Sequence, residues 1–165
     1  MGQLDGKIAL VTAGGGGIGQ ATAWLLAERG ASVIAADIDA AGLDETVRHS
    51  PAPDRLSTIV ADATTLQGAQ SAVAAAKAKF GGLSILVNVV GGSKPGKTVV
   101  DLTPEEWDGW VRLNLTSAFL MCKAALPVMA ASGGGSIVNI SSGASECLTT
   151  SPPWSPSCPA TTEHS

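Results

Sequence analysis

A run of small residues near the N-terminus limits most strongly what this chain can fold into. It spans residues 13–19 and reads AGGGGIG. The residues before it, 7–12, form a short β-rich apolar run, and from Ile18 onward apolar residues recur at helical spacing until Gly30. The pattern predicts a strand that turns sharply into a helix.

The alternation of apolar strands and amphipathic helices continues along the chain. Four further strands are expected at residues 32–36, 58–61, 83–90 and 136–140. Helices are expected at residues 40–49, over a stretch ending at Gly81–Gly82, and from Pro104 to about Ala131. Continuous apolar strands are typical of a parallel sheet covered on both faces. The predicted fold class is α/β, with a doubly wound, Rossmann-like parallel sheet.

The last expected helix starts at a recognisable capping signal. Thr103 is the cap, Pro104 suits the first turn, and Glu106 lies three residues after the cap. Pro127 is expected to kink the helix near its end. One face of this helix is expected to carry Ala118, Phe119, Cys122, Ala125, Leu126 and Met129.

The alternation stops before the last residues of the sequence. In residues 147–165, twelve of nineteen residues are Pro, Ser or Thr, and no helix or strand fits that composition. We therefore expect a dinucleotide-binding domain at residues 1–146 and a disordered Pro/Ser/Thr-rich tail at residues 147–165.

Composition excludes several classes of partner. The net charge is −4 and the ten basic residues do not cluster, so neither nucleic acid nor an anionic membrane is expected. The longest apolar run, residues 85–90, is too short to span a bilayer, and no targeting signal is visible. The three cysteines lack metal or disulfide spacing, so we expect no metal and a reduced, cytoplasmic setting.

The glycine-rich turn is suited to an anion. The spacing Gly15-x-Gly17-x-x-Gln20 does not match the usual dinucleotide fingerprint, whereas a stretched version with small residues at Ala13, Gly17 and Gly19 does. A Cβ at Gly17 or Gly19 would crowd the cofactor or the strand–helix contact. Free backbone N–H groups and the helix dipole would favour a pyrophosphate. The alternative is a merely flexible loop.

Two acids follow the second and third strands. Asp37 lies eighteen residues after Gly19, where a carboxylate can accept hydrogen bonds from the adenosine ribose and would repel a 2′-phosphate. NAD is therefore expected rather than NADP, the alternative being a solvated aspartate at a strand end. Asp62 is expected either to contact the adenine or to cap a helix.

Together these residues give a family resemblance. The chain resembles the short-chain dehydrogenase/reductases from residue 5 to about 145, through residues 11–19, Asp37, Asp62–Ala63, 86–91, Asn114 and 136–142. The resemblance implies hydride transfer between NAD and a small-molecule alcohol or ketone substrate. The cofactor-binding residues that the sequence and the resemblance indicate are Ala13, Gly14, Gly15, Gly17, Ile18, Gly19, Asp37, Asp62, Ala63, Asn88 and Gly91.

The resemblance also implies a catalytic set, which this sequence only partly contains. Asn114 matches the helix Asn that helps to hold a proton-relay water, and Ser142 matches the Ser that orients the substrate oxygen. The family's Tyr and Lys would fall at Ser155 and Pro159. No tyrosine occurs in the chain, so catalysis is expected to be impaired.

Further departures concern the cofactor side and the subunit interface. Ala13 replaces a Gly, a mild change, and Val89–Val90 replace Asn and Ala. The sheet is expected to be incomplete on its C-terminal side. A homo-oligomer through the 104–131 helix is therefore expected to have an incomplete interface.

Three hypotheses stay open from the sequence. The chain is a dehydrogenase whose last residues reflect a frameshift or an aberrant splice; or a non-catalytic NAD-binding fragment that associates with full-length relatives; or an unstable product without function.

Overall fold

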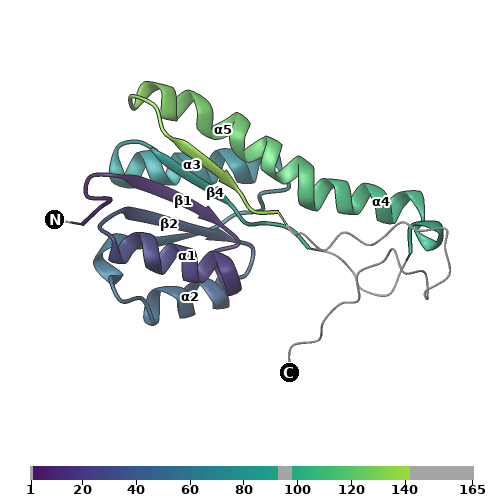
Figure 1. Ribbon diagram of the computed structural model, residues 1–165, viewed down its shortest axis with the longest axis horizontal. Coiled ribbons are helices and arrows are strands. Elements are labelled where there is room, and N and C mark those ends of the chain that lie inside the picture. Colours follow the sequence, from purple (N-terminus) through teal and green to yellow (C-terminus); the bar gives the residue numbers. More distant parts are fainter. Residues whose placement is uncertain (1, 93–97, 142–165) are drawn as a thin grey trace, which may run out of the picture.

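The computed structural model describes residues 2–92 and 98–141 (Figure 1). The expected tail at residues 147–165, the domain boundary after residue 146 and Ser142 lie outside these described residues. The predictions made for them therefore stay predictions.

The described part is built on one parallel sheet. Its five strands lie in the order β3-β2-β1-β4-β5. They are β1 (Ile8–Thr12), β2 (Ser32–Asp37), β3 (Leu56–Val60), β4 (Ile85–Asn88) and β5 (Ser136–Asn139). The chain first winds outward from β1 to β3 and then returns to the other side of β1, so that the sheet is doubly wound, as predicted.

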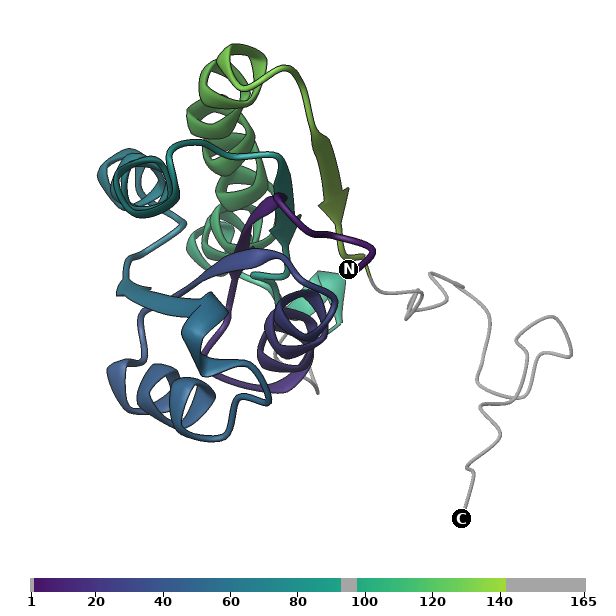
Figure 2. The same cartoon turned by 90° about the vertical axis from the view of Figure 1, so that its left-hand side faces the viewer.

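Helices cover both faces of the sheet (Figures 1 and 2). They are α1 (Gly17–Glu28), α2 (Ala40–Arg48), α3 (Leu66–Phe80), α4 (Pro104–Val111) and α5 (Ser117–Ala131), with a π-helical turn η3 (Arg112–Thr116) between the last two. Short 3-10 turns occur at η1 (Pro53–Arg55) and η2 (Val99–Asp101). Helices α1 and α2 pack on one face, and α3 and α5 on the other.

The central strands are buried on both faces, which explains their continuous apolar sequence. Leu10 and Leu86 join the core under α3 and α5, whereas Val11 and Val87, one position further along the same strands, join the core under α1 and α2. Successive side chains of a strand point to opposite faces. A strand covered on both sides therefore shows no polar alternation.

The long C-terminal helix packs in the core through a single ridge of residues. Its start is as expected, because Thr103 and Glu106 form a reciprocal capping box, and the helix continues past Pro127 to Ala131. The fully buried residues of α5 are Ser117, Met121, Ala125 and Met129. Of the residues placed on one face from the sequence, Ala125 and Met129 are buried, whereas Phe119 and Leu126 are 58% and 54% exposed. The buried ridge repeats every four residues, a single line along the helix.

This helix also bears on the expected absence of a membrane partner. By length and composition alone, Pro104–Ala131 is long and apolar enough to cross a membrane. Core helices of soluble proteins meet the same criterion. Here the Met121–Met129 ridge packs in the core beside α3, so that we treat the helix as a layer of the α/β fold.

Strand β5 forms an open side of the sheet. It pairs only with β4 among the described strands, and Val138 is 46% exposed. Ile140, just after the strand, is also exposed. The described sheet is therefore incomplete on its C-terminal side, as predicted.

The turn from β1 to α1 contains a residue in a conformation that favours glycine. Ala13 has a φ of 53°, and it is the only residue other than glycine with a positive φ in the described part of the chain. The left-handed region costs an L-residue with a Cβ about 1–2 kcal/mol.

Replacing Ala13 with Gly is therefore expected to stabilise the protein. Relief of this conformational cost outweighs the greater freedom of glycine in the unfolded chain, for a net gain of about 0.5–1 kcal/mol in the free energy of unfolding. Urea unfolding followed by circular dichroism measures the change. The matched control is Ala130→Gly on the exposed side of α5, which should lower stability by about 0.5–1 kcal/mol. A loss of stability in Ala13→Gly would contradict the assigned backbone conformation.

The packing of α5 gives a second prediction. Met121→Ala should lower the free energy of unfolding by about 2–5 kcal/mol, because this side chain is almost fully buried. Leu126→Ala, on the exposed side of the same helix, should change it by less than about 0.5 kcal/mol. The two variants are compared by urea unfolding of dilute protein. An equal or larger loss in Leu126→Ala would contradict the packing of the helix through Met121.

Candidate functional site

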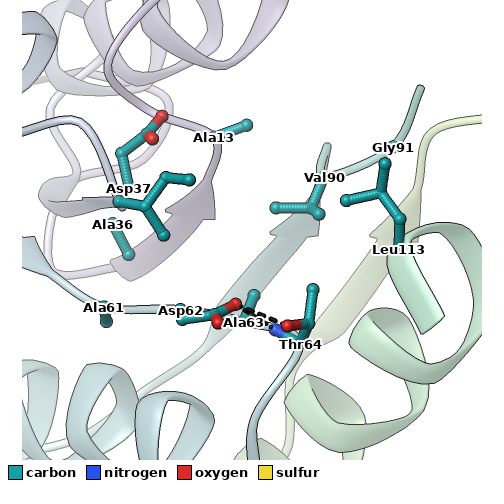
Figure 3. A pocket seen from close by; sticks show the side chains of 11 residues that line it. Ala13, Ala36, Asp37, Ala61, Asp62, Ala63, Thr64, Val90, Gly91 and Leu113 are labelled. Atoms are coloured by element: carbon teal, nitrogen blue, oxygen red, sulfur yellow. Dashed lines mark hydrogen bonds between the residues drawn. The ribbon is translucent and has the colours of Figure 1, made fainter. Parts of the chain in front are cut away.

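A cavity of about 200 Å³ opens at the carboxyl ends of the strands (Figure 3). It lies where the winding of the sheet reverses between β1 and β4, the place where open α/β sheets bind ligands. The residues that line it are Ala13, Ala36, Asp37, Ile38, Ala61, Asp62, Ala63, Thr64, Val90, Gly91 and Leu113. Ala13 and Asp37 lie across the cavity from Gly91 and Leu113.

The glycine-rich turn at this cavity needs glycine for two different reasons. A Cβ on Gly19 would overlap with the carbonyl oxygen of Ala13, so that only glycine lets α1 begin against the end of β1. Gly17 has open space around it but a φ of 50°, so that its requirement is conformational. The expected strand–helix contact is therefore found at Gly19 and not at Gly17.

The carboxylate of Asp37 is held in place by the turn. Its Oδ2 accepts the backbone N–H of Gly15 at 2.9 Å, and its Oδ1 accepts the N–H of Asp39 at 3.0 Å. An ionised carboxylate offers about four acceptor positions, so capacity remains for further donors. Because Asp37 also lines the cavity, a ligand hydroxyl there can donate to a carboxylate that is already oriented.

Asp62 makes a local turn. Its Oδ1 accepts both the N–H of Thr64 at 2.8 Å and the hydroxyl of Thr64 at 2.7 Å, whereas Thr65 caps helix α3. Asp62 therefore does not cap the helix directly, which was one of its two expected roles. It and the buried Ala63 line the cavity opposite the end of β4.

A buried threonine not singled out as a site residue fixes the loop after β4. The hydroxyl oxygen of Thr12, the last residue of β1, accepts the N–H groups of Val89 at 2.9 Å and Val90 at 3.2 Å. The backbone leading to Gly91 is thereby held against the central strand. In the sequence, Thr12 is recognisable only as a β-branched residue before a turn. Its hydrogen-bond partners lie more than seventy positions away.

Asn88 lies beside the cavity rather than in its lining. Its side chain is 5% exposed and donates to Asn139 Oδ1 at 2.8 Å and to the Cys122 sulfur at 3.6 Å. These bonds tie β4 to β5 and to α5, the backbone-fixing role that the sequence also allowed.

Asn114 lies next to Leu113, a residue of the cavity lining, but is not itself part of that lining. It lies in the π-helical turn, and its side chain accepts the N–H of Gly92 at 2.9 Å and donates to the carbonyls of Gly92 at 2.9 Å and Trp110 at 3.0 Å. A Cβ on Gly91 would lie 2.9 Å from Asn114 Oδ1. The side chain thus secures the loop after β4 to the long helix. Ser142, the other catalytic residue that the resemblance implies, lies outside the described residues.

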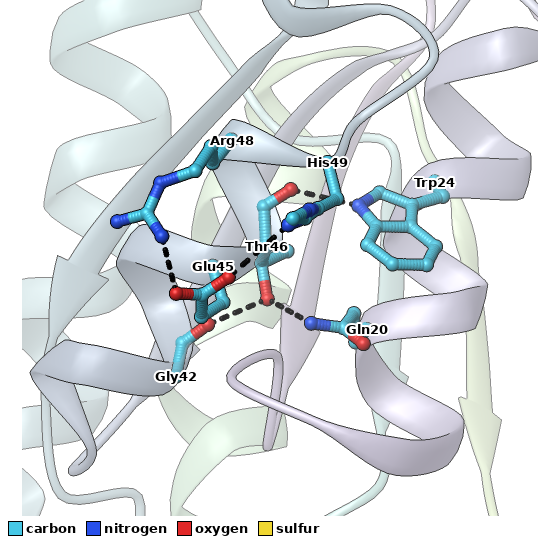
Figure 4. A network of polar contacts seen from close by, with 7 residues as sticks. All are labelled: Gln20, Trp24, Gly42, Glu45, Thr46, Arg48 and His49. Carbon is cyan, nitrogen blue, oxygen red and sulfur yellow. Dashed lines mark hydrogen bonds and ion pairs between the residues drawn. The ribbon is translucent and has the colours of Figure 1, made fainter.

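Helix α2 contributes a polar network that the sequence did not indicate (Figure 4). The fully buried hydroxyl of Thr46 lies 2.8 Å from the carbonyl of Gly14 and accepts from Gln20 Nε2 at 2.9 Å. The indole N–H of Trp24 donates to the carbonyl of Thr46 at 2.7 Å. Arg48 and His49 pair with Glu45 on the exposed side of α2.

The lining of the cavity favours a ligand with hydroxyl groups. Within residues 2–92 and 98–141 no group of three or more His, Cys, Asp or Glu could hold a metal. The cavity combines a mostly apolar lining with two oriented carboxylates, Asp37 and Asp62, and the glycine-rich turn contributes Ala13 to it, an arrangement that suits a nucleotide.

Comparison with known proteins places this arrangement in a family. Residues 7–155 match the family model described as short chain dehydrogenase. The chain is 40% identical over 145 residues to the D-threitol dehydrogenase of Mycolicibacterium smegmatis, covering 85% of this chain and 54% of that protein. It is 34% identical over 141 residues to the 3-oxoacyl-acyl-carrier-protein reductase FabG of Thermotoga maritima, covering 85% of this chain and 57% of that protein.

A solved structure agrees with these relatives. The crystal structure of a protein from Burkholderia xenovorans assigned to the short-chain dehydrogenase/reductases superposes with a TM-score of 0.78 at 44% identity, over 84% of this chain and 55% of that one. The chain spans about half the length of the curated relatives it matches. The match over residues 7–155 and the shared fold confirm the resemblance: the chain belongs to the short-chain dehydrogenase family.

Proposed function

We propose that this chain binds NAD and serves an oxidoreductase reaction, a hydride transfer between NAD and a small-molecule alcohol or ketone. The observation that carries the proposal is the Asp37 carboxylate, which is oriented by the Gly15 N–H and lines the cavity at the carboxyl end of β2. Membership of an oxidoreductase family supports the reaction class.

The residues present fit the adenosine half of NAD. Asp37 can accept the ribose hydroxyls, and the wall made by Ala36, Ile38 and Ala61 is apolar, as an adenine ring requires. The start of α1 presents backbone N–H groups and the positive end of the helix dipole to the pyrophosphate. The assigned set is Ala13, Gly14, Gly15, Gly17, Ile18, Gly19, Asp37, Asp62, Ala63, Asn88 and Gly91.

Asp37 also supports NAD over NADP. A 2′-phosphate would be placed against a carboxylate that two backbone N–H groups hold in position. No lysine or arginine occurs among the cavity-lining residues to offset that repulsion.

The catalytic contribution of this chain rests on few residues. When bound, the cofactor would supply the hydride acceptor for an alcohol in its oxidised form or the hydride donor for a ketone in its reduced form. Asn114 secures the loop that ends the cavity, and Ser142 is assigned to orient the substrate oxygen. The substrate also needs a group that gives or takes a proton, which contributes about 10²–10⁴-fold to such reactions. Because no tyrosine occurs in the 165 residues and the last lysine is Lys123, we propose that turnover by these residues is impaired.

A second candidate function is a non-catalytic NAD-binding fragment that associates with full-length relatives. The exposed apolar residues of the long helix favour it, since Trp107, Phe119 and Leu126 are all more than half exposed. The same face would serve a homo-oligomer through residues 104–131, with an interface left incomplete on the β5 side.

A reduced, cytoplasmic setting remains our proposal from the cysteine pattern.

Asp37→Asn tests the cofactor assignment. The wild-type chain should bind NAD more tightly than NADP, because only NADP brings a phosphate to the carboxylate. In Asp37→Asn the affinity for NAD should fall about tenfold through loss of charge-assisted hydrogen bonds, while the affinity for NADP should hold or rise. Isothermal titration calorimetry with each dinucleotide measures both dissociation constants.

The matched control for this experiment is Asp44→Asn, which removes an exposed acid of α2 and should leave both constants unchanged. Absence of heat with NAD at millimolar concentration in the folded wild-type chain would overturn the proposed function. An unchanged ratio of the two constants in Asp37→Asn would overturn the role of Asp37.

A further inference from the structure

Helix α2 touches the glycine-rich turn at two places. A Cβ on Gly42 would overlap with the carbonyl oxygen of Gly15, so that the helix backbone lies directly against the turn. One turn further along the same helix, the Thr46 hydroxyl oxygen lies 2.8 Å from the carbonyl oxygen of Gly14. Neither residue lines the cavity. Helix α2 therefore contacts the glycine-rich turn outside the cavity.

The Thr46 hydroxyl has one hydrogen and two acceptors within reach. Its oxygen is 2.8 Å from Gly14 O and 2.9 Å from Gly42 O. Helical geometry already gives the Gly42 carbonyl the backbone N–H of residue 46. The Gly14 carbonyl is thus the acceptor that depends on the hydroxyl. Gln20 Nε2 donates to the same oxygen at 2.9 Å, which directs the hydroxyl hydrogen away from Gln20 and toward a carbonyl.

The two ends of one peptide unit are held by different elements. The carbonyl of Gly14 and the N–H of Gly15 belong to the same planar group and point in opposite directions. Thr46 binds the carbonyl end at 2.8 Å, and the Asp37 carboxylate binds the N–H end at 2.9 Å. Rotation of this peptide would break both bonds. Since glycine flanks it on both sides, its own backbone offers little resistance to rotation.

We propose that Thr46 is a positioning residue for the dinucleotide site, acting through the Gly14–Gly15 peptide on the glycine turn and on the Asp37 carboxylate. This inference rests on the proposed function for its ligand, NAD. Thr46 does not touch the ligand. Because the peptide is fixed before binding, NAD binding does not carry the entropic cost of ordering a glycine-rich segment. Thr46 also keeps the Asp37 carboxylate in the orientation in which it can accept hydrogen bonds from the ribose hydroxyls.

The alternative is that Thr46 is only a buried helix residue whose hydroxyl donates a hydrogen bond to the Gly42 carbonyl of the same helix. In that case its loss would lower stability without a selective effect on the turn. The two roles are therefore separated by comparing NAD affinity and turn mobility at matched stability.

The test uses Thr46→Val, which removes the hydroxyl and nearly keeps the shape of the side chain. The expected result is a rise of about tenfold in the dissociation constant for NAD, equivalent to about 1.4 kcal/mol. In the free protein, hydrogen exchange of the Gly15 amide should accelerate relative to that of Ile34, a core amide of β2. Using this ratio removes the contribution of global unfolding.

Three further variants complete the test. Thr46→Ser restores a hydroxyl and should return both readouts to wild-type values. Gln20→Ala removes the donor to Thr46 and should shift both readouts in the same direction but less, which keeps the test usable if Thr46→Val does not fold. Val33→Ala, in the sheet core under α1 and α2, should lower the melting temperature and leave both readouts unchanged.

Equal changes in Thr46→Val and Val33→Ala would overturn the inference, as would an unchanged exchange ratio in Thr46→Val. If the wild-type chain binds no NAD, the proposed function fails, and the exchange ratio alone then decides whether Thr46 holds the turn.

Discussion

The contact between the first turn of α1 and the end of β1 is the constraint on which the rest of the structure depends. No Cβ fits at Gly19 against the Ala13 carbonyl, so that the helix can start directly on the central strand. The helix begins four residues after Ala13, which lines the cavity, and β1 pairs with β2 on one side and with β4 on the other. The site therefore follows from how the sheet is wound.

Most of the fold could be predicted because the inner strands are buried on both faces and read as apolar runs. The predicted bounds of a strand were wrong where apolar residues outside the strand are buried or held by other contacts. Residues 83–90 were expected as one strand, but β4 is only Ile85–Asn88. Leu83 is buried in the core before the strand begins, and the N–H groups of Val89 and Val90 bond to Thr12. On α5, composition alone could not select the buried ridge, because nearly every position is apolar.

The candidate site was predictable where the position of a residue relative to neighbouring sequence motifs indicates its role. An acid at the end of β2 after a glycine turn indicated Asp37, and the structure orients that carboxylate toward the turn. Thr12 and Thr46 could not be found in this way. Each is a β-branched residue in a regular element, and its hydroxyl meets backbone groups 77 and 32 positions away. Such partners exist only once the sheet and helices have come together.

The most direct test of the account is a nuclear magnetic resonance titration of the isotope-labelled chain with NAD. The account predicts that amide signals of residues 14–19, Asp37 and Asp62–Ala63 shift together with one dissociation constant. Signals at the opposite end of the sheet, at Lys7 and Gly133–Gly135, should stay in place. Shifts confined to that opposite end, or no shifts at millimolar NAD in a folded chain, would contradict it.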